Sequence, residues 1–577
     1  MKNDDSLEHF IKEHAQPYDA EKDVYEKLPY DKPVEAGKNT PIYNAHSYHT
    51  KVPYQGIIPF IEHYTKPGDL ILDPFCGSGQ TGVASLLCSS GPRKVILNDL
   101  SPAAIHIARN YCTPCDVKQL KDEFERIKGV VKEEFDWLYG TEHIDTETGK
   151  IIPATIDFMI WSEVYVCQPK KRDTHKHPIS PDGCGGEIVL WEVAVDHESI
   201  EVKNSFICPH CGETWRKTDL NLLRSIPVMT TYRYTDPKTG KKHRSEHRVS
   251  EFELHRLKDI EEREIPYWYP TTPFISSREM WRGVHRDSGI TRACDFYTKR
   301  NLWALSRILK EIREINDPLL KCKLLFAFTG VVNTSSKMNS HNLSGQARPR
   351  IGTLYIPSFK EDASVLRLFS GKSKSHLILA SVQKSFNKSE CFFLTKHAGA
   401  LSEVANDSID YIFTDPPFGS NIFYSDCSFL WESWLNEFTD DDKEAVWNKS
   451  RKPEEGGKTL DGYKTLMAKS FQEMYRVLKP NRWATVVFSN SDDHVWESIQ
   501  DAAYQAGFVI YGGKEFDKVQ RSFKGVRGEK GTEKVISKDV LLNLHKPNIP
   551  LVRSKELTRI DDVEGFILQQ IKEHLQY

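Results

Sequence analysis

Residues 70–91 read LILDPFCGSGQTGVASLLCSSG, and this stretch decides the fold. Its first residues, LILD, predict a buried strand, and the glycine-rich turn after them opens a segment with helical periodicity. Residues 93–112, RKVILNDLSPAAIHIARNYC, repeat the order of strand, turn and helix. Strands that alternate with helices at this spacing predict a parallel, doubly wound sheet.

This alternation stops near residue 115 and resumes near residue 390. Residues 408–418, SIDYIFTDPPF, predict a strand and its exit turn. Two helices, another strand and the late strand DVLLNLHK (539–546) are expected to follow. We therefore expect one α/β domain that is split by an insertion of roughly 250 residues.

The composition excludes several classes of protein. A chain of 577 residues with 39% hydrophobic and 28% charged residues is typical of a soluble globular protein. No apolar run reaches the ~18 residues that a membrane span needs, and the charged N-terminus does not fit a secretory signal. Twelve cysteines are too few for a disulfide scaffold and favour a reducing, cytoplasmic setting. The net charge of −3 does not by itself indicate a nucleic-acid partner, because binding depends on local patches.

The glycine turn DPFCGSG (73–79) is a candidate ligand site. Glycines allow the backbone to approach a ligand closely, and the N–H groups at a helix start favour a negative group. Asp99 ends the next expected strand, where an acid can accept hydrogen bonds from ribose hydroxyls. The alternative is that the glycines only make a tight connection between strand and helix.

A second motif, Asp415-Pro416-Pro417-Phe418, follows a later strand. Ligands of open α/β sheets bind at the carboxyl ends of strands. The prolines fix the backbone, so that a carboxylate and a carbonyl can point the same way, and an exposed aromatic offers a stacking surface. This set suits the binding of a planar amino group. The alternative is a plain proline turn with a solvated acid.

The two motifs together resemble those of a known family. DPFCGSG and TDPPF match the cofactor and catalytic motifs of DNA amino-methyltransferases that use S-adenosylmethionine, so the resemblance implies a Rossmann-like class I methyltransferase sheet. Residues 408–435 more closely resemble bacterial adenine-specific DNA methylases that contain a zinc ribbon. Further matching stretches are YHTKVPYQG (48–56), SSKMN (335–339), GTLYIPS (352–358) and YRVLKP (475–480).

The resemblance covers most of residues 43–545 and implies how the chain is divided. The expected parts are an N-terminal arm (1–42), the cofactor half of the methyltransferase domain (43–115), an inserted zinc-ribbon and helical region for DNA target recognition (116–385), the catalytic half (386–548) and a C-terminal helix (549–577).

The resemblance also implies the cofactor site. Phe75, Gly77 and Gly79 would shape the pocket for the methionine part of the cofactor, and Asp99 would hold the ribose. The other cofactor-binding residues would be Asp73 and Pro74 of the glycine motif, and His49, Thr50 and Lys51 of the segment that closes over the methionine end. An acid after the third strand, which often binds the cofactor's adenine, is not evident in FLTKHAGALSE (393–403) and leaves that contact open.

The implied reaction is methylation of the N6 amine of adenine in double-stranded DNA, after the base has flipped out of the duplex. Asp415 and the Pro416 carbonyl would accept hydrogen bonds from the amine, and Phe418 would stack on the base. Residues 419–426, GSNIFYSD, are expected to form a mobile loop that orders when the base arrives. Asn421 and Tyr424 are therefore candidates for substrate contact.

Four cysteines predict a structural zinc site. Cys208-Pro-His-Cys211 is a zinc-knuckle signal, and Cys167 and Cys184 form a partner pair interrupted by 16 residues. Histidines could replace Cys167, and a second cysteine pair is interpreted as two ordinary thiols. These alternatives are His175, His177 and His210, and the pair Cys112 and Cys115.

The insertion carries its positive charge locally, where it could bind phosphates, although such turns are usually solvated faces. The candidate DNA contacts are Lys241, Lys242 and Arg244, with Lys170, Lys171 and Arg172 earlier in the insertion and Lys518, Arg521 and Lys524 later in the chain.

Three other functions stay open. One is N4-cytosine methylation, although the family more often has serine than aspartate at position 415 for that base. The others are RNA methylation and a catalytically silent zinc-ribbon protein that binds DNA. Besides DNA, proteins of a restriction-modification or phage-defence system are candidate partners, and the sequence leaves that system open.

Overall fold

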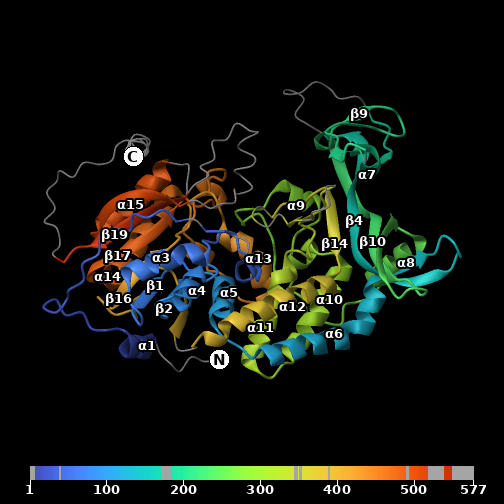
Figure 1. The fold of residues 1–577 in the computed structure, drawn as a ribbon. Helices are drawn as coiled ribbons and strands as arrows, with labels where there is room; N and C mark the ends of the chain where they lie inside the picture. The colour runs from blue at the N-terminus through green and yellow to red at the C-terminus, as the bar shows by residue number, and fades with distance from the viewer. Residues whose placement is uncertain are drawn as a thin grey trace, which may run out of the picture.

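The computed structural model describes residues 7–34, 36–37, 40–170, 183–196, 198–343, 348–349, 352, 354–387, 390–488, 493–516 and 539–548. It shows a mixed α/β protein with two large sheets (Figure 1). One sheet has seven strands and lies among the helices drawn in blue and orange. The other has eight strands, among which β4 and β10 are drawn in cyan to green and β14 in yellow.

The seven-stranded sheet has the order β15-β2-β1-β16-β17-β19-β18. Strands β15, β2, β1, β16 and β17 are parallel, whereas β19 is antiparallel to both β17 and β18. The bounds are β1 (Leu70–Asp73), β2 (Lys94–Asp99), β15 (Cys391–Thr395), β16 (Ile409–Thr414), β17 (Leu478–Phe488), β18 (Val509–Phe516) and β19 (Asp539–Lys546).

Both faces of this sheet are covered, which explains the continuous apolar run in β1. Ile71 packs into one core cluster, while Leu70 and Leu72 pack into the other. Strands buried on both faces have near-continuous apolar sequences rather than alternating ones. The flanking helices are α3 (Tyr54–Tyr64), α4 (Gln80–Leu86), α5 (Pro102–Cys112), α13 (Tyr424–Leu435), α14 (Leu460–Val477) and α15 (Asp493–Ala506).

Between α5 and β15 the chain builds the second sheet and a group of helices. The sheet has the order β11-β10-β4-β14-β12-β13, and β3 and β5 also pair with β4. Its strands are β3 (Gly140–Ile144), β4 (Ile151–Pro169), β5 (Glu187–Val189), β10 (Leu220–Thr235), β11 (Lys242–Arg248), β12 (Asn339–Ser340), β13 (Arg348–Pro349) and β14 (Phe359–Ala363). Its main helices are α6 (Val117–Tyr139), α8 (Glu251–Glu262), α10 (Lys299–Arg313), α11 (Pro318–Val332) and α12 (Val365–Val382).

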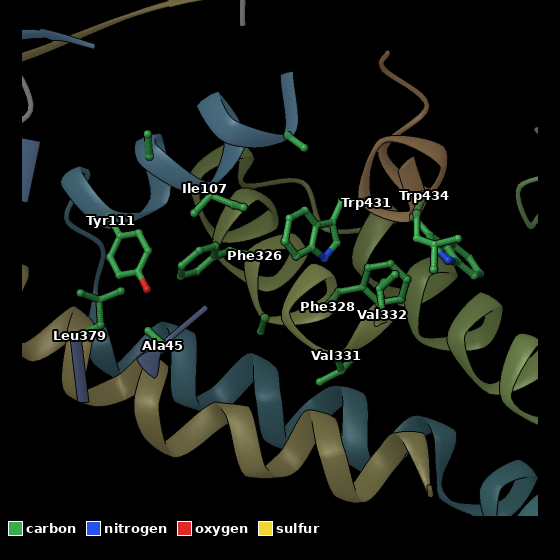
Figure 2. Packing of buried hydrophobic residues seen from close by; sticks show 14 of the residues in the cluster. Ala45, Ile107, Tyr111, Phe326, Phe328, Val331, Val332, Leu379, Trp431 and Trp434 are labelled. Carbon is green, nitrogen blue, oxygen red and sulfur yellow. The ribbon is translucent and has the colours of Figure 1, made fainter. Parts of the chain in front are cut away.

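One apolar core joins this region to the first sheet. Figure 2 shows Phe326 of α11 between Tyr111 of α5 and Trp431 of α13. The Tyr111 and Phe326 rings meet edge to face, with centroids 5.3 Å apart. Because helices from both regions share this core, the two regions pack directly on one another.

Strands β10 and β11 pair antiparallel and form a hairpin. The expectation of an N-terminal arm outside the core is wrong for α1 (Leu7–His14). Leu7, Phe10 and Ile11 share one helix face and are buried in the core. The expected C-terminal helix, 549–577, lies outside the described residues. Within the described part of the chain, no helix is long and apolar enough to cross a membrane.

Candidate active site

One cavity lies at the carboxyl ends of β1, β2, β15 and β16, where the expected motifs meet. The ends of parallel strands share one edge of a sheet, so residues far apart in sequence gather there. Its lining includes Tyr48, Thr50, Lys51, Asp73, Pro74, Phe75, Gly77, Asp99, His397, Phe413, Asp415, Pro417, Tyr424, Lys443 and Glu444.

Asp99 anchors the glycine turn. Its Oδ2 accepts a hydrogen bond from the Gly77 N–H at 2.8 Å, and its Oδ1 accepts one from the Ser101 N–H at 2.9 Å. Burial raises the pKa of Asp99 to about 6, although these two hydrogen bonds act in the opposite direction. The carboxylate is therefore fixed in the cavity wall, with lone pairs left for further donors.

The two glycines of the turn have different tasks. Gly77 has φ +49°, and a Cβ there would lie 2.9 Å from Cε1 of Tyr48. Gly79 has φ +76°, and a Cβ there would lie 2.6 Å from the Ala108 Cβ on α5. Gly77 lines the cavity, whereas Gly79 is not among its lining residues and instead allows α5 to pack against the turn.

Asp73 ties the turn to the neighbouring strand. Thr81 Oγ1 donates to its Oδ2 at 2.6 Å, and Thr414 Oγ1 donates to its Oδ1 at 2.8 Å. Burial raises the pKa of Asp73 to about 7. Its carboxyl group therefore holds the ends of β1 and β16 in register, and we assign it a positioning role in the cavity wall.

Asp415 follows β16 directly and faces the same cavity. The turn is held from behind, because the Tyr463 hydroxyl donates to the Pro417 carbonyl at 3.0 Å. Pro416 is buried. Burial raises the pKa of Tyr424 well above its usual value, and the nearby Asp415 charge acts in the same direction. The acid and this phenol are therefore close neighbours in the cavity.

Phe418 is not exposed, so the expectation of an open stacking surface there is wrong. Its side chain is 5% exposed and packs edge to face against Phe488, with centroids 5.4 Å apart. The predicted mobile loop is also wrong at its end, because Tyr424 begins helix α13. Tyr424 lines the cavity, whereas Asn421 does not.

Of the three predicted residues before α3, two line the cavity and one does not. Thr50 lines the cavity, and so does Lys51, but the Lys51 ammonium donates to the backbone carbonyls of His46, at 2.8 Å, and Tyr43. Burial lowers the pKa of Lys51 to about 7. His49 is not among the lining residues, and its ring lies 5.1 Å from the Trp431 ring.

The sequence reasoning missed His397, which follows β15 and lines the cavity. Its Nδ1 accepts a hydrogen bond from the Gly399 N–H at 3.0 Å, so the neutral ring carries its proton on Nε2. Burial lowers its pKa, which favours this neutral form. The buried Nε2 has no hydrogen-bond partner within the described chain. The sequence signal that could have identified His397 is its position just after β15.

Lys443 and Glu444 also line the cavity and were not predicted. Glu444 accepts hydrogen bonds from the Ser425 N–H, at 2.8 Å, and from the Lys458 ammonium, also at 2.8 Å. These contacts connect the loop after α13 to the start of that helix. No local motif marks these residues, so only the tertiary structure reveals them.

The four predicted cysteines meet in one cluster. The Sγ atoms of Cys167, Cys184, Cys208 and Cys211 all lie within 4.8 Å of one another. Cys167 and Cys211 are 3.7 Å apart, and Cys184 and Cys208 are 3.8 Å apart. His210 instead places its Nε2 2.9 Å from the Glu187 carbonyl. Across the described residues this is the one group with metal-ligand spacing, and it excludes Cys112 and Cys115.

The predicted DNA contacts lie away from the cavity. Lys241, Lys242 and Arg244 are exposed on the β10–β11 hairpin and do not line it. Figure 1 shows this hairpin on the opposite side of the helices from the seven-stranded sheet. The candidates outside the described residues are Lys171, Arg172, His175, His177, Lys518, Arg521 and Lys524.

Comparison with known proteins gives a partial match. A family described as DNA methylase matches residues 2–110. No curated protein matches the chain. One similar solved structure is a candidate DNA modification methylase from Thermus thermophilus, complexed with S-adenosyl-L-methionine. It is 12% identical, and the match covers 29% of this chain and 56% of that one with a TM-score of 0.16.

Another similar structure is the antibiotic-resistance methyltransferase Kmr. It is also 12% identical, and the match covers 31% of this chain and 72% of Kmr with a TM-score of 0.16. Each of these two likenesses is confined to less than a third of the chain described here.

Proposed function

We propose that this chain transfers a methyl group from S-adenosylmethionine to the exocyclic N6 amine of adenine in DNA. The observation that carries the proposal is the meeting of the Gly77 turn, Asp99 and Asp415 in one cavity. Two further findings support it: the DNA methylase family matches residues 2–110, and the order of the seven-stranded sheet, with its antiparallel β19, suits a class I methyltransferase domain.

The cavity residues fit S-adenosylmethionine, which when bound supplies an electrophilic sulfonium methyl group. Asp99 would accept hydrogen bonds from ribose hydroxyls at the end of β2. His397 offers its buried Nε2–H, which lacks a partner within the described chain, to a ring nitrogen of the adenine moiety. We therefore assign to His397 the contact with the cofactor's adenine, for which the sequence shows no acidic residue.

Asp415 and the Pro416 carbonyl would bind the target amine. The lone pair of an exocyclic amine is delocalised into its ring, which makes the nitrogen a poor nucleophile. Hydrogen bonds from its two N–H groups to these oxygens draw the nitrogen towards tetrahedral geometry and localise the lone pair. Asp415 is also the group that can accept the proton that the amine loses, and positioning supplies much of the remaining catalysis.

The target base must leave the duplex to reach Asp415, because its amine is paired and stacked inside DNA. Phe418 is buried against Phe488 and does not line the cavity. Tyr424 does line it beside Asp415, so we assign the aromatic contact with the base to Tyr424.

The four-cysteine cluster would hold structural zinc. A tetrahedral site with Zn–S distances of about 2.3 Å places its sulfurs about 3.8 Å apart. The Cys167–Cys211 and Cys184–Cys208 separations of 3.7 and 3.8 Å match this value, and all four sulfurs lie within 4.8 Å of one another. Four protein ligands leave no open coordination position, so the metal would stabilise the ribbon and take no part in methyl transfer.

We further propose the division of labour among the parts of the chain. Residues 43–115 and 386–548 would form the methyltransferase domain, and residues 116–385 would recognise the DNA target. The exposed Lys241, Lys242 and Arg244 on the β10–β11 hairpin could contact phosphates, which attract protein cations without reading the sequence.

The reaction can be tested with S-adenosylmethionine that carries a labelled methyl group. Unmethylated duplex DNA and RNA are offered in parallel, and the products are digested for nucleoside mass spectrometry. We expect N6-methyladenine from DNA. N4-methylcytosine, methylated RNA, or no product from folded protein that binds the cofactor would each contradict the proposal.

The assignment of His397 has its own test. His397→Ala should weaken S-adenosylmethionine binding about tenfold, because the lost hydrogen bond is worth about 1.4 kcal/mol. Calorimetry on the protein without DNA measures this directly. His255→Ala, at an exposed position of α8, serves as the matched control. Equal cofactor affinity of the His397 variant and the wild type would remove His397 from the site.

A further inference from the structure

A second, separate cavity lies in the region between α5 and β15. It is bordered by the middle of β4, by the start of β10, by β14, and by the loop that leads into α10. In Figure 1 the elements β4, β10, β14 and α10 lie on the right of the molecule. Ser335, Ser336 and Lys337 of the stretch SSKMN also line it, and the proposed methyl transfer gives that stretch no role.

Three lysines at this cavity make no close ion pair among the described residues, although the Asp295 charge acts on Lys337 and the Glu163 charge on Lys360 from farther away. Within the described chain, no carboxylate lies within ion-pair distance of Lys299, Lys337 or Lys360. Lys337 Nζ donates to the Asp295 carbonyl oxygen at 2.8 Å, and Lys360 Nζ donates to Ser225 Oγ at 2.7 Å. An ammonium has three protons, so each of these two can make further hydrogen bonds.

The carboxylates at the cavity are mostly engaged by other side chains. Three of the five lie in ion pairs that do not involve the lysines: Asp287 with Arg286, Asp295 with Arg292, and Asp362 with Arg300. A fourth, Glu361, has its Oε1 2.8 Å from His341 Nδ1. The fifth, Glu261, is exposed on α8. The cavity therefore has an excess of positive charge on its lysine side.

Uncharged hydrogen-bonding groups face the same cavity without protein partners. Ser335 is 2% exposed, and its Oγ makes no hydrogen bond within the described chain. The same holds for Trp161 Nε1 and for Ser288 Oγ. A buried polar atom without a partner costs about 1–3 kcal/mol, so three of them around one cavity point to a ligand that hydrogen-bonds to them.

The chemistry of these groups selects the ligand. Ammonium groups and an indole N–H can only donate, and hydroxyls can donate, so the matching ligand is rich in acceptor oxygens and negatively charged. We propose that this cavity binds a phosphate group, held by Lys337 and Lys360 with Ser335 and Trp161 as neutral donors. Burial lowers the pKa of Lys360 to about 8 and also lowers that of Lys337, although the charges of Glu163 and Asp295 act in the opposite direction, and a bound anion would oppose the shift further.

A purely structural role for Lys337 and Lys360 would not explain why they share a cavity with unpartnered donors. Burial also lowers the pKa of Lys372 to about 8, as it does for Lys360. The Lys372 ammonium donates to a backbone carbonyl, that of Ala45. Lys372, however, lines neither cavity. Lys337 and Lys360 share one cavity with unpartnered donors, and Lys372 therefore provides a matched control.

The phosphate could belong to DNA or to a free nucleotide. Helix α13 connects the two cavities: Tyr424 at its start lines the first, and Trp434 near its end donates to Tyr297, which lines the second, at 3.0 Å. A helix of 12 residues is about 18 Å long. One DNA strand could therefore reach both cavities. The idea that the phosphate comes from DNA rests on the proposed function, whereas the phosphate site itself does not.

The test measures binding of inorganic phosphate and of a 20-base-pair duplex to the full chain. Phosphate is titrated by calorimetry, and the duplex by fluorescence anisotropy at several salt concentrations. The variants are Lys360→Met, Lys337→Met, Trp161→Phe and Ser335→Ala, with Lys372→Met as control and thermal melts to verify folding. Trp161→Phe and Ser335→Ala change one hydrogen-bonding group each, so they keep the test informative if a lysine variant fails to fold.

We expect each lysine variant to lose about tenfold or more in phosphate affinity, and Ser335→Ala to lose about threefold to tenfold without a lower melting temperature. If DNA is the source, duplex affinity falls too, and the slope of log K against log salt drops by about one for each lysine. If a free nucleotide is the source, only phosphate binding falls. Wild-type binding of both probes by all four variants, or an equal loss in Lys372→Met, would overturn the site. Absence of methyl transfer would leave these binding results unaffected.

Discussion

The two sheets assemble their candidate sites in different ways. In the seven-stranded sheet, Asp73, Asp99 and Asp415 each stand at or directly after the end of a parallel strand. In the eight-stranded sheet, the grouped side chains come from strand middles and distant loops, as with Trp161, Ser335 and Lys360. The cysteine cluster likewise joins β4 to a knuckle about 40 residues later.

The difference follows from the direction of the strands. Parallel strands deliver all their carboxyl ends to one edge, so a short motif after each strand is enough to build a site. Antiparallel strands alternate their ends, and their sites depend on how strands and loops pack afterwards. We therefore expect changes in the first cavity to affect chemistry with little effect on folding, and changes in the second region to affect metal content or anion binding without touching the cofactor.

The largest expected effect is on catalysis. Asp415→Asn keeps the size of the side chain but puts a donor where two acceptor oxygens were. Methyl transfer should fall about 100- to 1000-fold or more, while S-adenosylmethionine affinity and the melting temperature stay near wild type. Labelled methyl transfer, calorimetry and a thermal melt measure the three quantities. The exposed Asp442→Asn is the control. Near wild-type turnover in Asp415→Asn would exclude the proposal that Asp415 binds the target amine.

The next largest effect concerns the metal. Metal analysis of the wild type should give about one zinc per chain, and Cys208→Ser should remove it and lower the melting temperature. Cofactor affinity should not change, because the cysteine cluster lies in the region between α5 and β15 and not at the cavity of the seven-stranded sheet. Cys322→Ser, at a half-buried cysteine outside the cluster, should keep the zinc. A wild type that contains no zinc and is nevertheless fully folded would refute the metal site.

A third effect tests whether the glycine turn depends on helix packing. Gly79→Ala places a Cβ 2.6 Å from that of Ala108 at φ +76°. It should lower the free energy of unfolding by about 2–4 kcal/mol, from overpacking and left-handed strain together. Gly149→Ala has a similar φ, +66°, with nothing within 4 Å of the new Cβ, so it should lose about 1–2 kcal/mol. Equal losses in urea unfolding would mean that α5 does not constrain the turn.

A fourth effect is a pH dependence. Burial raises the pKa of Asp73 from 3.8 to about 7, so its stabilising contribution is full below pH 3.8 and is lost as pH rises through 7. Asp73→Asn does not titrate there. Between pH 4 and 7 the wild type should therefore lose stability relative to the variant, as measured by urea unfolding at each pH. Parallel stability profiles of the two proteins would show that Asp73 does not titrate in this window.

Much of the first sheet could be predicted because its signals are local. The strands that contain Asp73, Asp99 and Asp415 were recognisable from apolar runs and the turns after them. The four cysteines of the cluster were predicted correctly as one group, since zinc-ligand spacing is partly written in the sequence. The expectations about Phe418 and the loop at Tyr424 failed because burial and helix extension depend on neighbours such as Phe488.

The sequence by itself determined the doubly wound sheet, the edge of that sheet where polar residues collect, and the set of cysteines. Periodicity, glycine turns and ligand spacing are properties of short segments, so no tertiary information was needed. Only the tertiary structure decided that Gly79 serves helix packing, that His397 enters the first cavity, and that Lys337 and Lys360 meet at the second. Those outcomes depend on which surfaces pack together, and no short stretch of sequence encodes that.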